Sequence, residues 1–281
     1  VVATLGNIII SQNNIKARRI MPHAGIQSLT ILPGTTRTGD PESFEEITIR
    51  PGDTISIVGP TGSGKTAFIN DIEVFAQKDT VTGRKILING TEPSEDLVRD
   101  PAKKPIAMIT QNTKCLADLT VAEFLTMHLR SRKLSRPGLM DEAVDLANEF
   151  TGEKISASMR MSSLSGGQTR SLFIADAVVI SDTPVILLDE IENAGIFKDR
   201  VIEILRERHK AIIFVTHDPY VALLTGRRIV MGCGAVQKIL TPGNGEQEAL
   251  REIARMDADL MRLREKIRAG ELLLTRPGVS A

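Results

Sequence analysis

The residues with the clearest chemical meaning form one glycine-rich segment, Gly59-Pro60-Thr61-Gly62-Ser63-Gly64-Lys65-Thr66. This segment matches the pattern G-x-x-x-x-G-K-[ST] and stands between the apolar run TISIVG and a predicted helix. Glycines in such a loop let successive backbone N–H groups curl around phosphates, and the helix that follows presents its positive end to the same charge. Lys65 is expected to reach the β- and γ-phosphates and Thr66 to bind Mg²⁺. The loop predicts binding of a nucleoside triphosphate, and a chance glycine-rich turn is the weaker interpretation in this context.

A second group of reactive side chains follows the buried strand predicted at Val185–Asp189. A carboxylate at the end of such a strand, close to a phosphate loop, can hold Mg²⁺, and this is the role we predict for Asp189. Glu190 is then placed to orient or deprotonate an attacking water. Two acids that merely end a strand would be the simpler interpretation if the phosphate loop were absent.

The pentapeptide Leu164-Ser165-Gly166-Gly167-Gln168 precedes the predicted helix TRSLFIADAVVI. Ser165 and the amides of Gly166 and Gly167 therefore lie at a helix N-terminus, which makes a second site suited to an anion. One chain cannot easily bring this site and the phosphate loop onto one phosphate group.

The LSGGQ pentapeptide resembles the signature motif of the ATP-binding cassette ATPases. The resemblance covers about residues 47–234, with the phosphate loop, Gln111, LSGGQ, VILLDE and His217 in the order of that family. It implies that two subunits pair head to tail and that each ATP lies between one phosphate loop and the other subunit's Ser165-Gly166-Gly167-Gln168. It also implies ATP and Mg²⁺ as ligands and a second cassette, in a homodimer or a paired cassette, as a partner.

Two further residues gain their roles from their places in this series. Gln111 ends a predicted strand at the start of a helical segment, where its amide oxygen could bind Mg²⁺ and its neighbours could report the γ-phosphate to a partner. His217 follows the predicted strand AIIFVT and resembles the family's switch histidine, whose imidazole contacts the γ-phosphate and the catalytic carboxylate. The predicted catalytic residues are thus Lys65, Glu190 and His217, and the predicted metal ligands are Thr66, Gln111 and Asp189.

The sequence departs from the common transporter pattern in three respects, one of which is that the N-terminal extension and the C-terminal helix lie outside the minimal cassette. Glu190-Ile191-Glu192-Asn193-Ala194-Gly195 replaces the usual loop after the catalytic carboxylate and looks more like the soluble branches of the family. The family usually stacks an aromatic residue upstream of the phosphate loop on adenine, but Phe44 is the only aromatic residue among the first 67. Base stacking is therefore expected to be weak or to come from elsewhere.

Composition excludes several classes of protein. The chain of 281 residues has 35 Lys+Arg and 35 Asp+Glu, so its formal net charge is zero and gives no general attraction to nucleic acid or anionic lipid. Cys115 and Cys233 cannot form a disulfide framework, which favours a reduced, intracellular protein. No apolar run approaches the roughly 18 residues that cross a bilayer, and we expect no signal peptide.

The order of predicted elements indicates an α/β fold with a P-loop NTPase core of the ABC type. We predict strands at 47–49, 54–59, 85–90, 106–110, 185–189, 211–216 and 228–232. The predicted domains are an N-terminal β-rich extension (1–45), an ATPase domain (46–243) with a helical subdomain inserted at about 112–168, and a C-terminal amphipathic helix and tail (244–281).

The C-terminal helix carries a stripe of apolar residues at alternating spacings of three and four, the pattern of a short coiled coil. The stripe consists of Ile253, Met256, Leu260, Leu263 and Ile267. Two interpretations stay open: the stripe docks on a partner, or it packs back onto the chain's own cassette.

We therefore expect an ATPase that closes as a dimer on two ATP molecules and passes the motion to a partner through the helical subdomain. The first candidate for its role is the cytoplasmic ATPase subunit of a membrane transporter, held at the inner face of the membrane by a permease. The alternative is a soluble energy-coupling ATPase acting on a protein or metallocofactor machine. A nucleic-acid partner is not expected, because the basic stretch Arg130, Arg132, Lys133 and Arg136 lacks interleaved aromatic residues.

Overall fold

The computed structural model describes residues 26–110, 113, 115, 118–190 and 195–272. Its main sheet has six strands in the order β5-β6-β7-β3-β8-β9. Neighbouring strands are parallel from β5 to β8, and β9 runs antiparallel to β8. The strands are β3 (Thr54–Val58), β5 (Ile106–Ile109), β6 (Val185–Asp189), β7 (Ala211–Val215), β8 (Arg227–Gly232) and β9 (Ala235–Leu240).

Helices cover both faces of this sheet, which is why β6 and β7 are continuously apolar. Successive side chains of a strand point to opposite faces. Accordingly, Ile186 and Leu188 of β6 pack in one apolar core with α3, α4, α5 and α6, whereas Val185 and Leu187 pack in a second core with α1. The helices are α1 (Lys65–Val74), α2 (Glu95–Arg99), α3 (Val121–Ser131), α4 (Leu139–Glu149), α5 (Gly166–Val179), α6 (Lys198–Glu207), α7 (Pro219–Leu224) and α8 (Asn244–Arg268), with one turn of 3-10 helix at Met161–Ser163.

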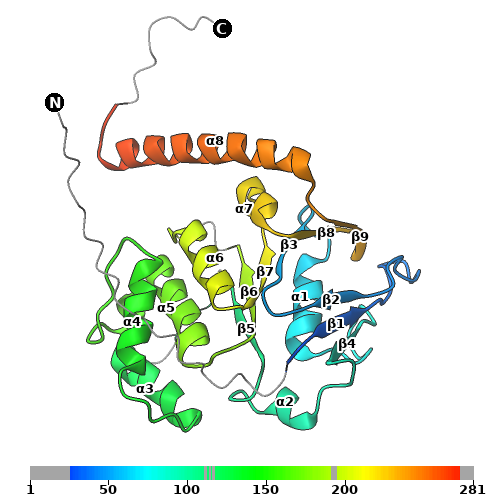
Figure 1. Ribbon diagram of the computed structural model, residues 1–281, viewed down its shortest axis with the longest axis horizontal. Helices are drawn as coiled ribbons and strands as arrows, with labels where there is room; N and C mark the ends of the chain where they lie inside the picture. Colours follow the sequence, from blue (N-terminus) through cyan, green and yellow to red (C-terminus); the bar gives the residue numbers. More distant parts are fainter. Residues whose placement is uncertain (1–25, 111–112, 114, 116–117, 191–194, 273–281) are drawn as a thin grey trace, which may run out of the picture.

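A small antiparallel sheet with the order β2-β1-β4 packs beside α1 (Figure 1). Its strands are β1 (Leu29–Leu32), β2 (Ile47–Ile49) and β4 (Lys85–Ile88). Leu29 pairs with Ile49 on one side and with Ile88 on the other. The predicted boundary at residue 45 lies between β1 and its partner β2, and the division into domains remains a prediction.

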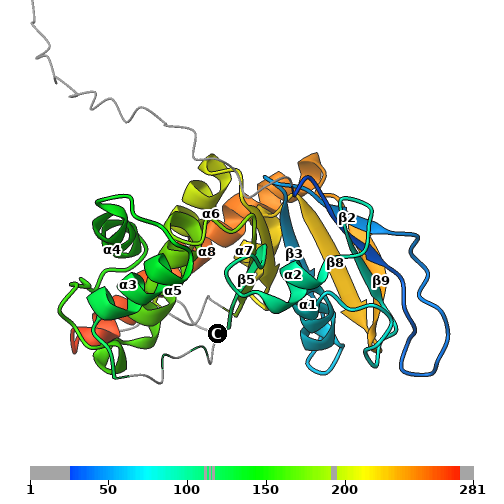
Figure 2. The same cartoon turned by 90° about the horizontal axis from the view of Figure 1, so that it is seen from below.

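Local sequence features set the starts of the helices α3 and α4. Thr120 caps α3 and forms a reciprocal capping box with Glu123, while α4 starts after Gly138, whose φ of 82° favours glycine. Figures 1 and 2 show α3, α4 and α5 gathered at one end of the molecule and the small sheet at the other. The predicted fold class, an ABC-type P-loop α/β core with these two additions, is confirmed.

The C-terminal helix α8 crosses above α7 and extends past it (Figure 1). Leu250, Ile253, Ala254 and Asp257 are half-buried, and every residue from Ala258 to Arg268 is exposed. Of the helices that the structure describes, not one combines the length and the apolar character needed to cross a membrane.

Candidate functional site

The glycine-rich loop joins the end of β3 to the start of α1, as predicted. Gly59 and Gly64 have φ angles of 151° and 101°. A Cβ atom on Gly59 would come within 2.3 Å of the carbonyl oxygen of Met231, and one on Gly64 within 2.8 Å of the Cα of Gly234. Both positions therefore require glycine because of conformation and of space.

The polar side chains of the loop lie where the phosphates are expected. Lys65 is 7% exposed, and its Nζ donates hydrogen bonds to the carbonyl oxygens of Gly59 (2.8 Å) and Pro60 (3.1 Å). Ser63 Oγ is buried and has no hydrogen-bond partner among the described residues. Thr66 is exposed in the first turn of α1. A buried ammonium and an unpaired hydroxyl in a loop of backbone N–H groups suit an anionic ligand.

The turn between β8 and β9 contacts the phosphate loop and supports it. The N–H of Gly234 donates to the carbonyl oxygen of Ser63 at 2.9 Å. Arg37, in the connection between β1 and β2, packs on Gly234 and donates from Nη2 to the carbonyl oxygen of Gly62 at 2.6 Å. Sequence reasoning missed these contacts because they join segments about 25 and 170 residues apart.

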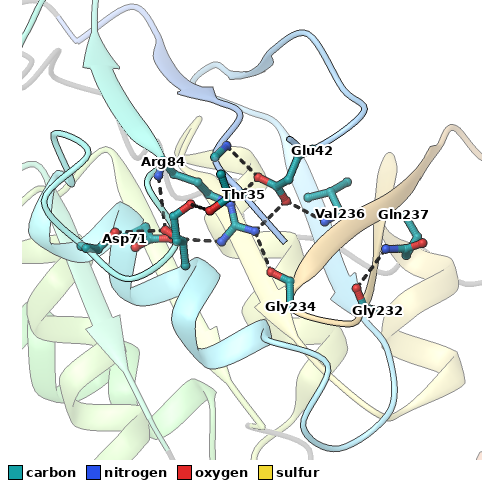
Figure 3. Close-up of polar contacts among 11 residues, drawn as sticks. Thr35, Glu42, Asp71, Arg84, Gly232, Gly234, Val236 and Gln237 are labelled. Carbon is teal, nitrogen blue, oxygen red and sulfur yellow. Dashed lines mark hydrogen bonds and ion pairs between the residues drawn. The ribbon is translucent and has the colours of Figure 1, made fainter. Parts of the chain in front are cut away.

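A buried ion network continues this bracing into the small sheet (Figure 3). Arg84 is 0% exposed and pairs with Glu42 at 2.6 Å and Asp71 of α1 at 3.0 Å. Its Nη2 also donates to the carbonyl oxygen of Gly234 at 3.1 Å. The N–H of Val236 in β9 donates to Glu42 at 2.8 Å. The network thus fixes α1, the small sheet and the β8–β9 turn to one another around the phosphate loop.

Two acidic residues, Asp189 and Glu190, stand at the end of β6. Asp189 is the last residue of β6 and lies opposite Val215 of β7. Glu190 has a positive φ of 49°, and its N–H donates to the carbonyl oxygen of Val215 at 2.9 Å. This left-handed conformation is uncommon for glutamate and turns the chain sharply at the predicted catalytic position.

His217, two residues after β7, faces Glu190. Its Nε2 lies 3.8 Å from Oε1 of Glu190, within the range of an ion pair when the imidazole is protonated. About half of the His217 side chain and a third of the Glu190 side chain are exposed. The two side chains can therefore contact each other and a ligand at the same time.

A cavity of about 700 Å³ connects the phosphate loop with this pair. Its lining also includes residues of α7 and α8. The lining residues are Thr61, Glu190, Lys198, His217, Asp218, Pro219, Tyr220, Ile253, Met256, Asp257, Leu260 and Arg264.

Lys198 forms ion pairs with two other residues that line this cavity. Its Nζ lies 2.6 Å from Asp218, the residue after His217, and 3.3 Å from Asp257 of α8. Burial by itself would lower the pKa of Lys198, but Asp218 and Asp257 outweigh burial and raise that pKa. The position of α8 is thus linked to the segment that carries His217.

The signature residues lie at the start of α5, as predicted. Ser165 caps α5 in a capping box with Gln168, and its Oγ donates to Glu153 at 2.7 Å. Gly166 and Gly167 form the first turn of α5. None of these four signature residues is among the described residues that line the cavity beside the phosphate loop. Ser165 and Gln168 instead donate to Glu153 and to the carbonyl oxygen of Lys154.

Gln111, the remaining predicted site residue, lies outside the described residues, as do residues 191–194 of the loop after Glu190. Within the part of the chain that is described, no three side chains of His, Cys, Asp or Glu gather into a metal site.

The match to known proteins agrees with this geometry. Residues 45–193 match the family model described as ABC transporter. An uncharacterized ABC transporter ATP-binding protein of Methanocaldococcus jannaschii is 49% identical over 88% of this chain and 95% of that protein. A spermidine/putrescine import ATP-binding protein of Acidothermus cellulolyticus is 32% identical over 74% of the chain, which spans only about 55% of that longer relative.

Solved structures show the same fold. CbiO1 of Clostridium perfringens, described as part of the ABC transporter complex CbiONQ, has a TM-score of 0.60 and 21% identity, covering 86% of this chain and 100% of that one. A dimeric ATP-binding cassette bound to ADP and phosphate has a TM-score of 0.58 and 23% identity, covering 76% and 99%. The chain therefore belongs to the ABC transporter family, as an ATP-binding subunit that binds and hydrolyses ATP.

Proposed function

We propose that two copies of this chain form two ATP sites, each built from the phosphate loop of one copy and the N-terminus of α5 of the other. The observation that carries this proposal is that the signature residues at the start of α5 do not line the cavity beside the phosphate loop of their own chain. The N-termini of α1 and α5 each suit an anion, and the second of these sites is left for the phosphates of another copy. A second copy supplies the missing half, and a dimer is what the ADP-bound relative forms.

Each predicted residue then has a role in phosphoryl transfer, where catalysis consists mostly of positioning and charge stabilisation. The loop amides and Lys65 hold the β- and γ-phosphates. Glu190 accepts a proton from the attacking water, or orients that water, and His217 contacts both Glu190 and the γ-phosphate. The 3.8 Å between His217 and Glu190 leaves the pair close enough to act on one ligand.

Magnesium fits the oxygen atoms at this edge of the sheet. Thr66 offers a hydroxyl and Asp189 a carboxylate, and these are ligand types that Mg²⁺ prefers beside phosphate oxygens and water. So few protein ligands are typical of Mg²⁺ bound together with a nucleotide. When bound, the ion would neutralise charge on the β- and γ-phosphates, and Gln111 is the third predicted ligand.

A membrane permease is the partner that we propose for the helical region. A cavity of about 450 Å³ opens where the α3–α4 connection meets the C-terminal end of α5 and the segment before β5. Leu134, Leu139, Val179 and Ile180 give it an apolar lining, and its rim carries both cations and the carboxylates of Asp100 and Asp182. Such a cavity suits an apolar side chain on a polar segment, and the ATPase would then work at the cytoplasmic face of the membrane.

Native purification in mild detergent tests this proposal. A multi-spanning membrane protein should copurify with the wild-type chain and be identified by mass spectrometry. The variant Leu134→Asp should lose this protein and keep its ATP affinity, whereas Val81→Asp, at a position 97% exposed in the segment before β4, should keep both. Copurification of a soluble enzyme complex alone would favour the energy-coupling alternative.

A further inference from the structure

Helix α8 has a side to which the proposed ATP hydrolysis and permease docking assign no role. Its apolar stripe consists of Ile253, Met256, Leu260, Leu263 and Ile267. The last four side chains have exposed fractions of 59%, 46%, 44% and 60%. A stripe of this kind at heptad spacing needs a covering surface, because isolated helices of this length are marginally stable.

The first half of α8 is fixed to the chain's own cassette. Glu246 pairs with Arg228 at 3.0 Å, and Asp257 pairs with Lys198 at 3.3 Å. Beyond Asp257 every residue up to Arg268 is exposed, although Leu260 and Arg264 still border the cavity next to Glu190. Arg262 and Arg268 pair with acidic residues of the same helix. The sequence left open whether the stripe packs on the chain's own cassette or docks on a partner. Burial against the cassette is found only for residues before Ala258.

The charged residues that flank the stripe point to its partner. Glu252, Asp257 and Asp259 flank its first half, and Arg264 and Lys266 flank its second half. In an antiparallel pair of identical helices, the acidic half of one lies beside the basic half of the other. A parallel pair would place Glu252 beside the acidic residue at position 257 of the partner helix, and only Asp259 would meet a basic residue, at position 264.

We propose that α8 pairs antiparallel with α8 of a second copy through this stripe and holds two cassettes together without nucleotide. The contact is isologous, as expected for a symmetric dimer, and Leu260 of one helix lies opposite Leu263 of the other. It is continuous with the nucleotide face, because Ile253, Met256 and Leu260 line the same cavity as Glu190 and His217.

The α8 contact adds a second interface to the proposed ATP-dependent dimer. Its role rests on that proposed dimer. The stripe spans 15 residues, about 22 Å of helix, so the pair is smaller than a standard stable interface. Its effect is to keep two cassettes at high effective concentration after they open.

Sedimentation without nucleotide tests the pairing. The wild-type chain should be a reversible dimer. Leu263→Asp/Ile267→Asp, at two stripe positions outside the lining of the nucleotide cavity, should weaken that dimer about a hundredfold or more with an unchanged circular dichroism spectrum and ATP affinity. The control Ala258→Asp, on the outer face of α8, should sediment as wild type. A wild-type chain that stays monomeric at the highest concentration tested, or a double variant that dimerises as wild type, would overturn the proposal.

The same variants separate this inference from the proposed ATP site. In a Glu190→Gln background, ATP should restore the dimer of Leu263→Asp/Ile267→Asp, because neither residue lines the cavity of the proposed composite site. If ATP fails to dimerise Glu190→Gln even with a wild-type α8, the composite site is wrong, while the nucleotide-free result still decides the helix contact.

Cysteine cross-linking tests the orientation without disturbing the whole stripe. In a Cys115→Ser/Cys233→Ser background, a mixture of Met256→Cys and Ile267→Cys chains should form disulfide-linked dimers in a mild oxidant. Neither variant should do so alone, because like positions are about 16 Å apart in the antiparallel pair. Dimers of Met256→Cys alone would indicate a parallel pair and contradict the proposal, as would the absence of dimers from the mixture.

Discussion

Nε2 of His217 lies 3.8 Å from Oε1 of Glu190, and the two side chains come from loops that follow the neighbouring parallel strands β7 and β6. The carboxyl ends of parallel strands share one edge of a sheet, which is how residues 27 positions apart come to face one ligand. The N–H of Glu190 also donates to Val215 of β7, so the backbone fixes the relation between the two loops.

This relationship predicts how the carboxylate contributes. Glu190→Gln should retain ATP binding and lower turnover by about 10²- to 10⁴-fold, the usual effect of losing a general base. Lys65→Ala should weaken binding itself. Glu203→Gln, on the exposed side of α6, is the matched control. Steady-state hydrolysis and equilibrium nucleotide binding check the prediction, and near-normal turnover of Glu190→Gln would remove Glu190 from this role.

Mixing two inactive chains tests whether a site is shared. Gly166→Asp should block the signature by repelling phosphate, and an Asp in the first turn of α5 near Arg170 should leave the helix folded. Heterodimers of Gly166→Asp with Lys65→Ala keep one intact composite site, so the mixture should hydrolyse ATP faster than either variant alone. No gain, with heterodimers shown to form, would contradict a shared site or show that one site cannot work alone.

Base selectivity is expected to be poor. The sequence has no Trp, its single Tyr is Tyr220 of α7, and the loop contact from the β1–β2 connection is made by Arg37 rather than an aromatic side chain. Competition binding should therefore place ATP and GTP within about tenfold, a difference of ~1.4 kcal/mol. Since stacking on an aromatic side chain contributes ~1 to 3 kcal/mol, a preference of several hundredfold would reveal a base pocket that we have not found.

The buried network around Arg84 should contribute to stability. Arg84→Met leaves the carboxylates of Glu42 and Asp71 buried without their cation and should lower the free energy of unfolding by about 3–5 kcal/mol. Arg99→Met, which removes an exposed pair with Glu95, should change it by less than about 1 kcal/mol. Urea unfolding of both variants measures these changes in the free energy of unfolding. Equal changes for the two variants would mean that the buried network is not a main source of stability.

The elements that the sequence predicts well are those encoded locally. Strands β6 and β7 are apolar over residues 185–188 and 211–215 because these residues are buried on both faces of the sheet, and α3 carries its own capping box at Thr120 and Glu123. The predicted motifs hold their chemistry in contiguous residues, so Lys65, Glu190 and Ser165 could be singled out before any fold was known.

Features that depend on distant partners could not be predicted in this way. Edge strand β9 is half exposed and shows no apolar run, so the sequence analysis did not identify it. Arg84 lies 42 residues from Glu42 and 13 from Asp71, and no periodic pattern links the three. Similarly, the heptad stripe was visible in α8, but only the contacts of Glu246 and Asp257 show where the helix leaves the cassette.

The position of the signature residues outside the cavity of their own phosphate loop has a consequence for gene dosage. With the proposed two-copy site, a chain hydrolyses ATP only in pairs, so at low concentration the total rate should follow the square of the amount of protein. Halving expression would then cut the rate by about fourfold rather than twofold. A contact such as the α8 pair would make this response linear, because chains already held in twos no longer need to meet by diffusion.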